Sequence, residues 1–162
     1  MGIFKMKTKK ITALLLSVLI FASVGGCSKK EQSKEDYTCT ISVKCDKILE
    51  NMDKLSEEKH GLVPEDGIIF SGSEIAFEEG ETAFDVLKRE LKNNKIHLDF
   101  TMPSGFDTAY IKGIGNIYEF DCGDMSGWMY TVNNEAQDVG CSQYLLKDGD
   151  VVEWSYALGD EW

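Results

Sequence analysis

The chain has 162 residues, of which 43% are hydrophobic and 28% are charged, and its formal net charge is −11. Residues 1–26 hold four of the 17 basic residues and no acidic one, so the rest of the chain has a net charge of 13 − 28 = −15. This charge excludes nucleic acids and anionic lipid headgroups as partners, because both would be repelled.

The start of the chain predicts export from the cell. Residues 1–10 are basic and residues 11–26 are apolar, which is typical of a secretory signal peptide. Val24-Gly25-Gly26-Cys27 resembles the lipobox of bacterial lipoproteins, in which the cysteine is lipidated after cleavage. We therefore predict a signal peptide at 1–26 and an anchor at Cys27 on the extracytoplasmic face of a bacterial cell membrane. A plain cleaved signal is the alternative.

The remaining chain is predicted to be a tether and one domain. Residues 28–36 are polar or charged throughout, so residues 27–36 are predicted to be a lipidated cysteine followed by a flexible tether. Residues 37–162 have the length of a single domain with one core.

Four further cysteines are expected in an oxidising compartment, where an even number favours disulfides. A strand from Cys39 to Cys45 would hold their Cα atoms roughly 20 Å apart, whereas a disulfide needs about 5.5 Å. This favours pairing of Cys39 and Cys45 with Cys122 and Cys141, but the connectivity stays open. A zinc site is the weaker alternative, because no Cys-x-x-Cys spacing is present.

The first part of the domain is predicted to be a strand, a short helix and two short strands. Residues 37–45 alternate like a strand, and Asp46 can cap a helix over Lys47–Leu55. Residues 56–66 are polar and predict a loop. Ser71-Gly72-Ser73 then separates two strand candidates, Gly67–Phe70 and Glu74–Phe77.

The main helix is predicted to begin at Thr82, because Thr82 and Asp85 have the spacing of a capping box. Helical periodicity follows at Phe84, Leu87 and Leu91, and Asn93-Asn94 ends it.

Strands and turns follow. Residues 96–101 predict a half-buried strand and residues 102–108 a loop. Tyr110–Ile117 is a strand candidate in which Gly113 and Gly115 indicate either a packing bulge or a close approach to the backbone.

The C-terminal third predicts an antiparallel sheet rich in aromatic rings. Trp128–Val132 suits a strand and Asn133-Asn134 a hairpin turn. Asp148-Gly149 is a second turn, and Val151–Tyr156 alternates with Trp154 and Tyr156 on one face. We expect these two rings in the core, whereas Trp128 suits the core and a ligand platform equally. The order of elements predicts an α+β fold with a mixed sheet, one main helix and one short helix.

The sequence shows no motif for catalysis, so an enzyme is not predicted. It lacks phosphate-binding loops and nucleophile motifs, and neither His60 nor His97 lies in one. Asp121 with Asp124, and Asp148 with Asp150, lack the spacing of a calcium-binding loop and are interpreted as turn residues. No metal site is predicted.

Several motifs resemble the bacterial DUF4430 family, in order and with their spacing. They are Cys39-x5-Cys45-Asp46-x-Ile48-Leu49, Gly80-Glu81-Thr82-Ala83-Phe84-Asp85-Val86-Leu87, Tyr110-Ile111-x-Gly113-Ile114, Tyr118–Gly123, Ser126-Gly127-Trp128-Met129-Tyr130-x-Val132-Asn133, Gly140-Cys141-Ser142-x-Tyr144 and Lys147–Trp154.

That family is similar to the C-terminal β-domain of the vitamin B12 carriers transcobalamin and intrinsic factor. The resemblance implies a β-grasp fold and a non-catalytic small-molecule-binding lipoprotein, with cobalamin or a related corrinoid as the suspected ligand. It places the ligand against seven residues, namely Tyr110, Trp128, Met129, Tyr130, Asp138, Val139 and Gly140.

The resemblance also implies binding partners for the chain. The helical domain of the carriers has no counterpart here, so a partner or a second binding domain would supply half of the pocket. Delivery to a membrane importer is the expected next step. The alternative hypothesis is an envelope protein–protein interaction module without a small-molecule ligand.

Overall fold

The computed structural model of the protein describes residues 37–105 and 107–159. The predicted signal peptide at 1–26, the Cys27 anchor and the tether to residue 36 lie outside the described residues. Within the described part, no helix has the length and apolarity needed for a membrane crossing.

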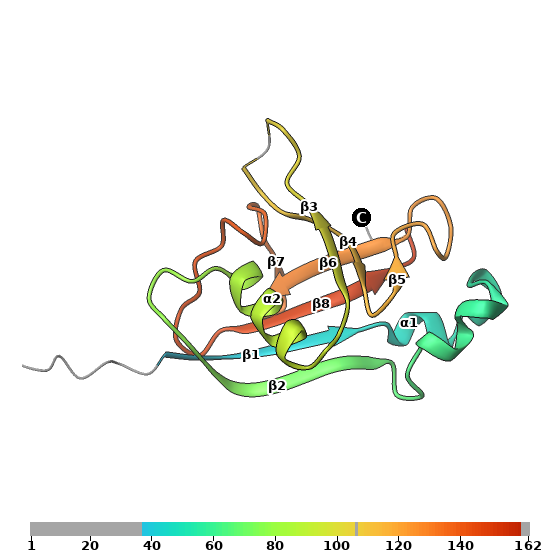
Figure 1. Ribbon diagram of the computed structural model, residues 1–162, viewed down its shortest axis with the longest axis horizontal. Helices are drawn as coiled ribbons and strands as arrows, with labels where there is room; N and C mark the ends of the chain where they lie inside the picture. Colours follow the sequence, from blue (N-terminus) through green and yellow to red (C-terminus); the bar gives the residue numbers. More distant parts are fainter. Residues whose placement is uncertain (1–36, 106, 160–162) are drawn as a thin grey trace, which may run out of the picture. The chain divides into compact units, whose positions relative to one another are not determined.

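A five-stranded mixed sheet is the largest element of the domain (Figure 1). Its central strands, β1 (Tyr37–Lys44) and β8 (Val151–Ala157), run parallel, and the other neighbouring strands pair antiparallel. The order is β2-β1-β8-β6-β7, where the remaining strands are β2 (Ile68–Phe77), β6 (Gly127–Val132) and β7 (Glu135–Ala136). A parallel central pair flanked by antiparallel strands is the β-grasp arrangement, so the predicted α+β fold is confirmed.

One face of this sheet is covered by the helix α2 (Ala83–Asn93) and by a second, three-stranded sheet (Figure 1). Buried residues of all three elements form a single core cluster. The second sheet has the order β3-β4-β5, with strands β3 (Leu98–Thr101), β4 (Tyr110–Ile114) and β5 (Ile117–Tyr118).

Strand alternation decides which side chains enter the core. In the parallel pair, Ile41 lies opposite Val152 and Val43 opposite Trp154, and all four are buried. Their neighbours on the other face are polar: the Ser42 hydroxyl lies 3.3 Å from a Glu153 carboxylate oxygen, and Lys44 forms an ion pair with the same carboxylate. The main sheet therefore has one apolar and one polar face.

The main helix is confirmed, and its capping box is formed. The Asp85 backbone N–H donates to the Thr82 hydroxyl over 3.2 Å, and the Thr82 N–H donates to the Asp85 carboxylate over 3.1 Å. The helix ends at Asn93, as predicted. Its buried face contains the three predicted residues and two more, namely Ala83, Phe84, Val86, Leu87 and Leu91.

The predicted helix over Lys47–Leu55 is wrong in its length. The chain instead forms a four-residue helix α1 (Asp46–Leu49) and a 3₁₀ turn η1 (Met52–Lys54), followed by a second 3₁₀ segment, η2 (Glu57–Leu62). Asn51 interrupts the helix, because its side-chain amide donates to the Lys47 carbonyl over 3.0 Å and its φ of −136° is not helical.

The two strands expected on either side of Ser71-Gly72-Ser73 are one continuous strand, β2. The register with β1 shifts at this point, where Cys39 pairs with Ile75 but Ile41 with Gly72. Glu74 takes up the irregularity with a φ of +53°. A bulge, rather than a loop, therefore accommodates the turn-forming residues.

The predicted hairpin turn at Asn133-Asn134 is confirmed, with φ values of +54° and +65°, and it joins β6 to β7. The predicted strand Tyr110–Ile117 is split into β4 and β5 by a similar turn at Gly115-Asn116, with φ values of +62° and +65°. Gly115 and Asn116 stand inside an alternating apolar pattern, which predicted one uninterrupted strand and gave no sign of the turn.

Both interpretations of Gly113 hold. The β3–β4 register skips Lys112 beside it, which is a bulge. A Cβ at Gly113 would also lie 2.7 Å from the ring of Tyr118, so that ring is what approaches the backbone.

Candidate functional site

A cavity of about 230 Å³ lies where the start of β4 meets the rings of β6 and β8. It is lined by Thr108, Ala109, Tyr110, Ile111, Trp128, Met129, Tyr130, Gly140, Cys141 and Trp154. Among these described residues none carries a formal charge, and four of them are aromatic. The cavity therefore suits an uncharged, largely apolar group.

The pairing of β6 with β8 places the rings beside the cavity. Tyr130 lies opposite Trp154, and the two rings stack with centroids 5.8 Å apart. Trp128 lies opposite Tyr156 and meets its ring edge to face at 5.3 Å. The Trp128 indole N–H donates to the Ile117 carbonyl over 2.9 Å, so this side chain is fixed and its polar atom is satisfied.

The structure places five of the seven ligand residues suggested by the resemblance on this cavity: Tyr110, Trp128, Met129, Tyr130 and Gly140. Asp138 and Val139 do not line it. Asp138 is exposed, and Val139 is 44% exposed with its carbonyl oxygen accepting a hydrogen bond from the Tyr130 hydroxyl.

Sequence reasoning missed the other lining residues, Thr108, Ala109, Ile111, Cys141 and Trp154. Trp154 was assigned to the core, and it is 1% exposed while also forming part of the cavity wall. Trp154 pairs with Tyr130 across the two strands, and this pairing could have indicated that Trp154 also lines the cavity. Thr108 ends the predicted loop 102–108, and Ala109 lies between that loop and the strand candidate Tyr110–Ile117. No periodicity therefore indicates where their side chains point.

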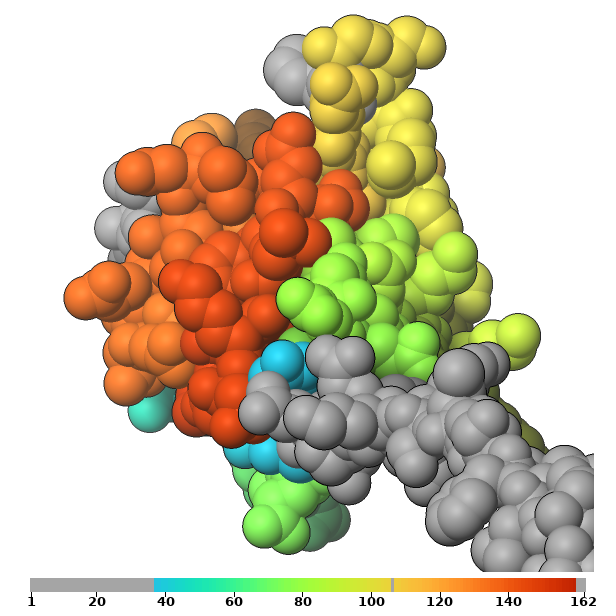
Figure 2. Space-filling view, turned by 90° about the vertical axis from the view of Figure 1, so that its left-hand side faces the viewer, coloured from blue at the N-terminus to red at the C-terminus, as the bar shows by residue number. Residues whose placement is uncertain are grey.

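The loop that carries Gly140 is fastened to the start of β4. The Ala109 N–H donates to the Ser142 hydroxyl over 2.8 Å, and that hydroxyl lies 3.3 Å from the hydroxyl of Thr108. The same loop accepts hydrogen bonds from the first turn of α2, where the N–H of Phe84 donates to the Cys141 carbonyl over 3.0 Å. Figure 2 shows this part of the surface, where the orange-red atoms of the loop meet the green atoms of α2.

Replacing Gly140 by alanine is expected to lower the free energy of unfolding by roughly 1–3 kcal/mol. A Cβ at this position would lie 1.7 Å from the Thr108 hydroxyl oxygen, so the loop or β4 must move. Urea unfolding measures the change. Gly61→Ala is the matched control, because a Cβ there meets nothing within 4 Å. Equal stability of the two variants would contradict the close packing of the loop.

The titratable groups of the cavity stay neutral at physiological pH. Burial raises the pKa of Tyr130 to about 12 and that of the Cys141 thiol to about 11. The pKa of Tyr110 is raised to about 12, chiefly because its hydroxyl donates to the Glu119 carboxylate. The Cys141 thiol is therefore not a thiolate nucleophile, and the cavity is suited to binding by shape and ring contact.

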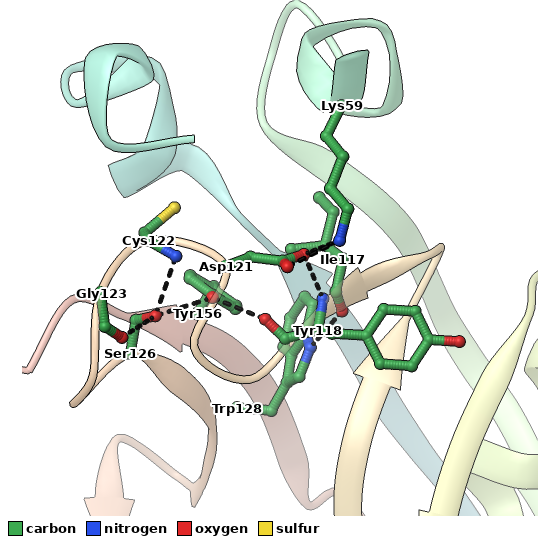
Figure 3. A network of polar contacts seen from close by, with 9 residues as sticks. All are labelled: Lys59, Ile117, Tyr118, Asp121, Cys122, Gly123, Ser126, Trp128 and Tyr156. Atoms are coloured by element: carbon green, nitrogen blue, oxygen red, sulfur yellow. Dashed lines mark hydrogen bonds and ion pairs between the residues drawn. The ribbon is translucent and has the colours of Figure 1, made fainter. Parts of the chain in front are cut away.

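A network of polar contacts fixes the neighbouring loop 119–126 (Figure 3). Asp121 is its centre: the carboxylate accepts from the Tyr118 N–H over 2.8 Å and from the Lys59 ammonium over 2.6 and 2.7 Å. The Tyr156 hydroxyl donates to the Tyr118 carbonyl over 2.7 Å and lies 3.0 Å from the Ser126 hydroxyl. This network holds Glu119 beside Tyr110 at the cavity.

Asp148 and Asp150, two of the aspartates interpreted as turn residues, accept hydrogen bonds from donors of the protein itself. Asp148 accepts from the Thr38 N–H over 2.9 Å. Asp150 is buried and accepts from the Lys147 N–H and the Asn133 side-chain amide, each over 2.9 Å, and from the Tyr144 hydroxyl over 3.2 Å. These contacts satisfy the buried carboxylate of Asp150.

The four cysteines of the domain are buried free thiols in the structure. Within residues 37–105 and 107–159, no three His, Cys, Asp or Glu side chains come together as a metal would require. The zinc alternative therefore finds no support in the described part of the chain.

The fold is similar to that of one part of haptocorrin in the crystal structure of haptocorrin in complex with Cbi (cobinamide). The TM-score is 0.54 at 15% identity, and the match covers 76% of this chain. It covers 25% of haptocorrin, so the chain corresponds to about a quarter of that protein's length. The comparison therefore shows an α+β fold like that of the matching part of haptocorrin.

The family agrees with the fold. Residues 80–157 match the family model of DUF4430, a domain of unknown function, so the resemblance predicted from the motifs is confirmed. A second solved structure, a protein of Ruminococcus gnavus ATCC 29149 whose suggested role is metal binding, matches with a TM-score of 0.43 at 16% identity. That match covers 75% of this chain and 97% of the other. No curated protein sequence matches the chain.

Proposed function

We propose that this protein is a non-catalytic lipoprotein that binds a corrinoid-like small molecule outside the cell, anchored to the membrane through Cys27. The observation that carries the proposal is the uncharged cavity at which five residues with a suggested ligand role meet. The likeness in fold to haptocorrin, which was solved with Cbi, supports the choice of a corrinoid as the first ligand to test. A hand-over to a membrane importer would follow from such a role.

The size of the cavity limits how the ligand binds. At about 230 Å³ the cavity is smaller than the roughly 300–1,000 Å³ of most small-molecule sites. It therefore takes one edge of a corrin ring or one of its side chains, while the rest of the ligand stays outside. A second binding domain or partner would cover that remaining surface, and affinity for the isolated protein is expected to be modest.

The uncharged walls favour binding over catalysis. His60 and His97 are engaged elsewhere, with the His60 Nε2 atom 3.0 Å from the Leu55 carbonyl and the His97 Nε2 atom 3.0 Å from the Tyr118 hydroxyl. Neither residue lines the cavity. A general base within reach of a bound group is thus missing from the described lining residues.

Cobinamide or cobalamin added to the purified protein is expected to change the corrin absorbance and to release or absorb heat. Tyr110→Ala should weaken binding about tenfold, or about 1.4 kcal/mol, because the ring is 49% exposed at the cavity and available to a ligand. Titration calorimetry measures both effects.

Leu145→Ala is the matched control, since Leu145 is 58% exposed and does not line the cavity. Its affinity should equal that of the unchanged protein. Absence of heat and of a spectral change with both corrinoids would refute the proposed ligand class.

An interaction module in the cell envelope is the second candidate function. Phe120 favours it, because this side chain is 58% exposed and its backbone has a φ of +68°, a costly conformation for an aromatic residue. Such strain is typical of residues held for a function. Recovery of the same membrane protein with and without added corrinoid, and its loss in Phe120→Ala, would favour this candidate.

A further inference from the structure

Two buried thiols lie at the end of β1 and in loop 119–126. Cys45 follows directly after β1 and is 0% exposed, and Cys122 lies within the loop and is 4% exposed. Neither thiol lines the cavity, so the proposed function does not use them.

Both thiols are neighbours of the same side chain, Tyr156. In the parallel register Lys44 pairs with Ser155, so the next residues along the two strands, Cys45 and Tyr156, lie side by side. On the other side, the Cys122 N–H donates to the Ser126 hydroxyl over 3.0 Å, and that hydroxyl lies 3.0 Å from the Tyr156 hydroxyl (Figure 3).

The two thiols also influence each other electrostatically. Burial is the main cause that raises the pKa of Cys45, the charges of Asp46 and Asp66 raise it further, and Cys122 adds a smaller contribution. The other two cysteines have different surroundings: Cys39 lies near Arg89 and Asp150, and the Cys141 sulfur points to the Ala109 carbonyl oxygen at 3.8 Å.

The chain segments that carry the two thiols are already tied together beside them. Lys59 of η2 forms its ion pair with Asp121, the residue before Cys122. The N–H of Cys45 donates to the Gly67 carbonyl over 2.7 Å, which closes the segment that contains Lys59. The segments that carry Cys45 and Cys122 are therefore joined by an ion pair.

We propose that Cys45 and Cys122 form a disulfide that fixes loop 119–126 to the end of β1. This would hold Glu119 of the loop against Tyr110 at the cavity. The inference rests on the proposed extracytoplasmic location, because disulfides persist in oxidising compartments. Whether Cys45 and Cys122 can form a disulfide in vitro depends neither on the location of the protein in the cell nor on its ligand.

The bond forms by exchange with a small disulfide such as oxidised glutathione. One cysteine thiolate attacks the small disulfide, which gives a mixed disulfide and releases one glutathione. The second cysteine then displaces the other glutathione, so the two protein thiols lose two electrons and two protons to the oxidant. Because both thiols are buried in the folded domain, we expect the exchange to occur during folding.

The test is a disulfide map of the full chain carrying Cys27→Ser, refolded from the reduced state in a mixture of reduced and oxidised glutathione. Cleavage after Lys and after Glu separates the four cysteines into different peptides: 36–44, 45–47, 120–135 and 136–147. The expected result is one linked pair, 45–47 with 120–135, and a mass lower by two hydrogen atoms.

Two control variants complete the design. Cys39→Ser and Cys141→Ser should each leave the linked pair intact, whereas Cys45→Ser should remove it. Alkylation of all four thiols after refolding, or a link through peptide 36–44 or 136–147 in place of this one, would overturn the proposal. Corrinoid titration of the same samples is a separate readout, so a failed ligand hypothesis leaves the map interpretable.

Discussion

Replacing Trp154 by alanine is expected to lower the free energy of unfolding by about 3–5 kcal/mol, a large part of the stability of a domain of this size. The side chain is 1% exposed, stacks on Tyr130 with centroids 5.8 Å apart, and lies beside Val43 across the parallel strand pair. Its removal leaves a void that joins the existing cavity, and the rigid sheet cannot collapse to fill it. Urea unfolding followed by far-ultraviolet circular dichroism measures the change.

Val151→Ala on the same strand is the matched control. Val151 is 45% exposed and points to the polar face of the sheet, so the expected loss is below about 0.5 kcal/mol. If both variants lost equally little stability, Trp154 would not be a core residue. If Trp154→Ala does not fold, Trp154→Phe keeps most of the buried area and should still lose about 1–2 kcal/mol.

The aromatic side chains show what the alternation of residues along a strand can predict and what it cannot. Trp154 and Tyr156 were predicted in the core from the alternation of Val151–Tyr156, and both are 1% exposed. Trp128 suited two roles equally, and it has both: it is 9% exposed with its N–H bound to Ile117, and it lines the cavity. Alternation assigns a face to a side chain, but it cannot show whether that face is completely filled.

Sequence motifs predicted those structural features that depend on interactions between residues close together in the chain. The capping box of Thr82 and Asp85 and the turn at Asn133-Asn134 depend on residues at most three positions apart, and both were predictable. The helix expected over Lys47–Leu55 failed because an apolar stripe was present, while Asn51 bonds the Lys47 carbonyl and ends the helix early. The competing side-chain hydrogen bond outweighed the periodicity.

The cavity itself depends on contacts that no local pattern contains. Gly140 fits against Thr108, and Ser142 accepts from the Ala109 N–H, across more than thirty residues of chain. The motifs of the family resemblance pointed to Gly140, but only the packing of the two loops explains why glycine is required there.

Raising the pH from about 9 to 12 is expected to destabilise the reduced protein strongly. Burial raises the pKa of Cys45 from 9.0 to about 12 and that of Tyr156 from 10.0 to about 12. In this range the unfolded state has already lost these protons while the folded state still binds them. The stability they contribute is therefore complete below pH 9 and is lost as the pH rises towards 12. At about 1.4 kcal/mol per pKa unit, the loss reaches at most about 4 kcal/mol for Cys45 and about 3 kcal/mol for Tyr156.

The same titration distinguishes the two redox states of the domain. A disulfide between Cys45 and Cys122 removes the ionisation of these two thiols, so the oxidised protein should lose less stability than the reduced protein over this range. Cys39 and Cys141, whose pKa values burial raises to about 11, contribute in both redox states, as do the tyrosines. Urea midpoints of reduced and oxidised protein at several pH values, with tyrosinate absorbance followed in parallel, separate these contributions. Cys45→Ala should remove the contribution of Cys45 and so give the reduced protein a flatter pH profile, while the thiol of Cys122, whose pKa burial also raises, still contributes. If the reduced protein kept its stability up to pH 11, the thiol of Cys45 would not be held neutral by burial, and the packing described at the end of β1 would be wrong.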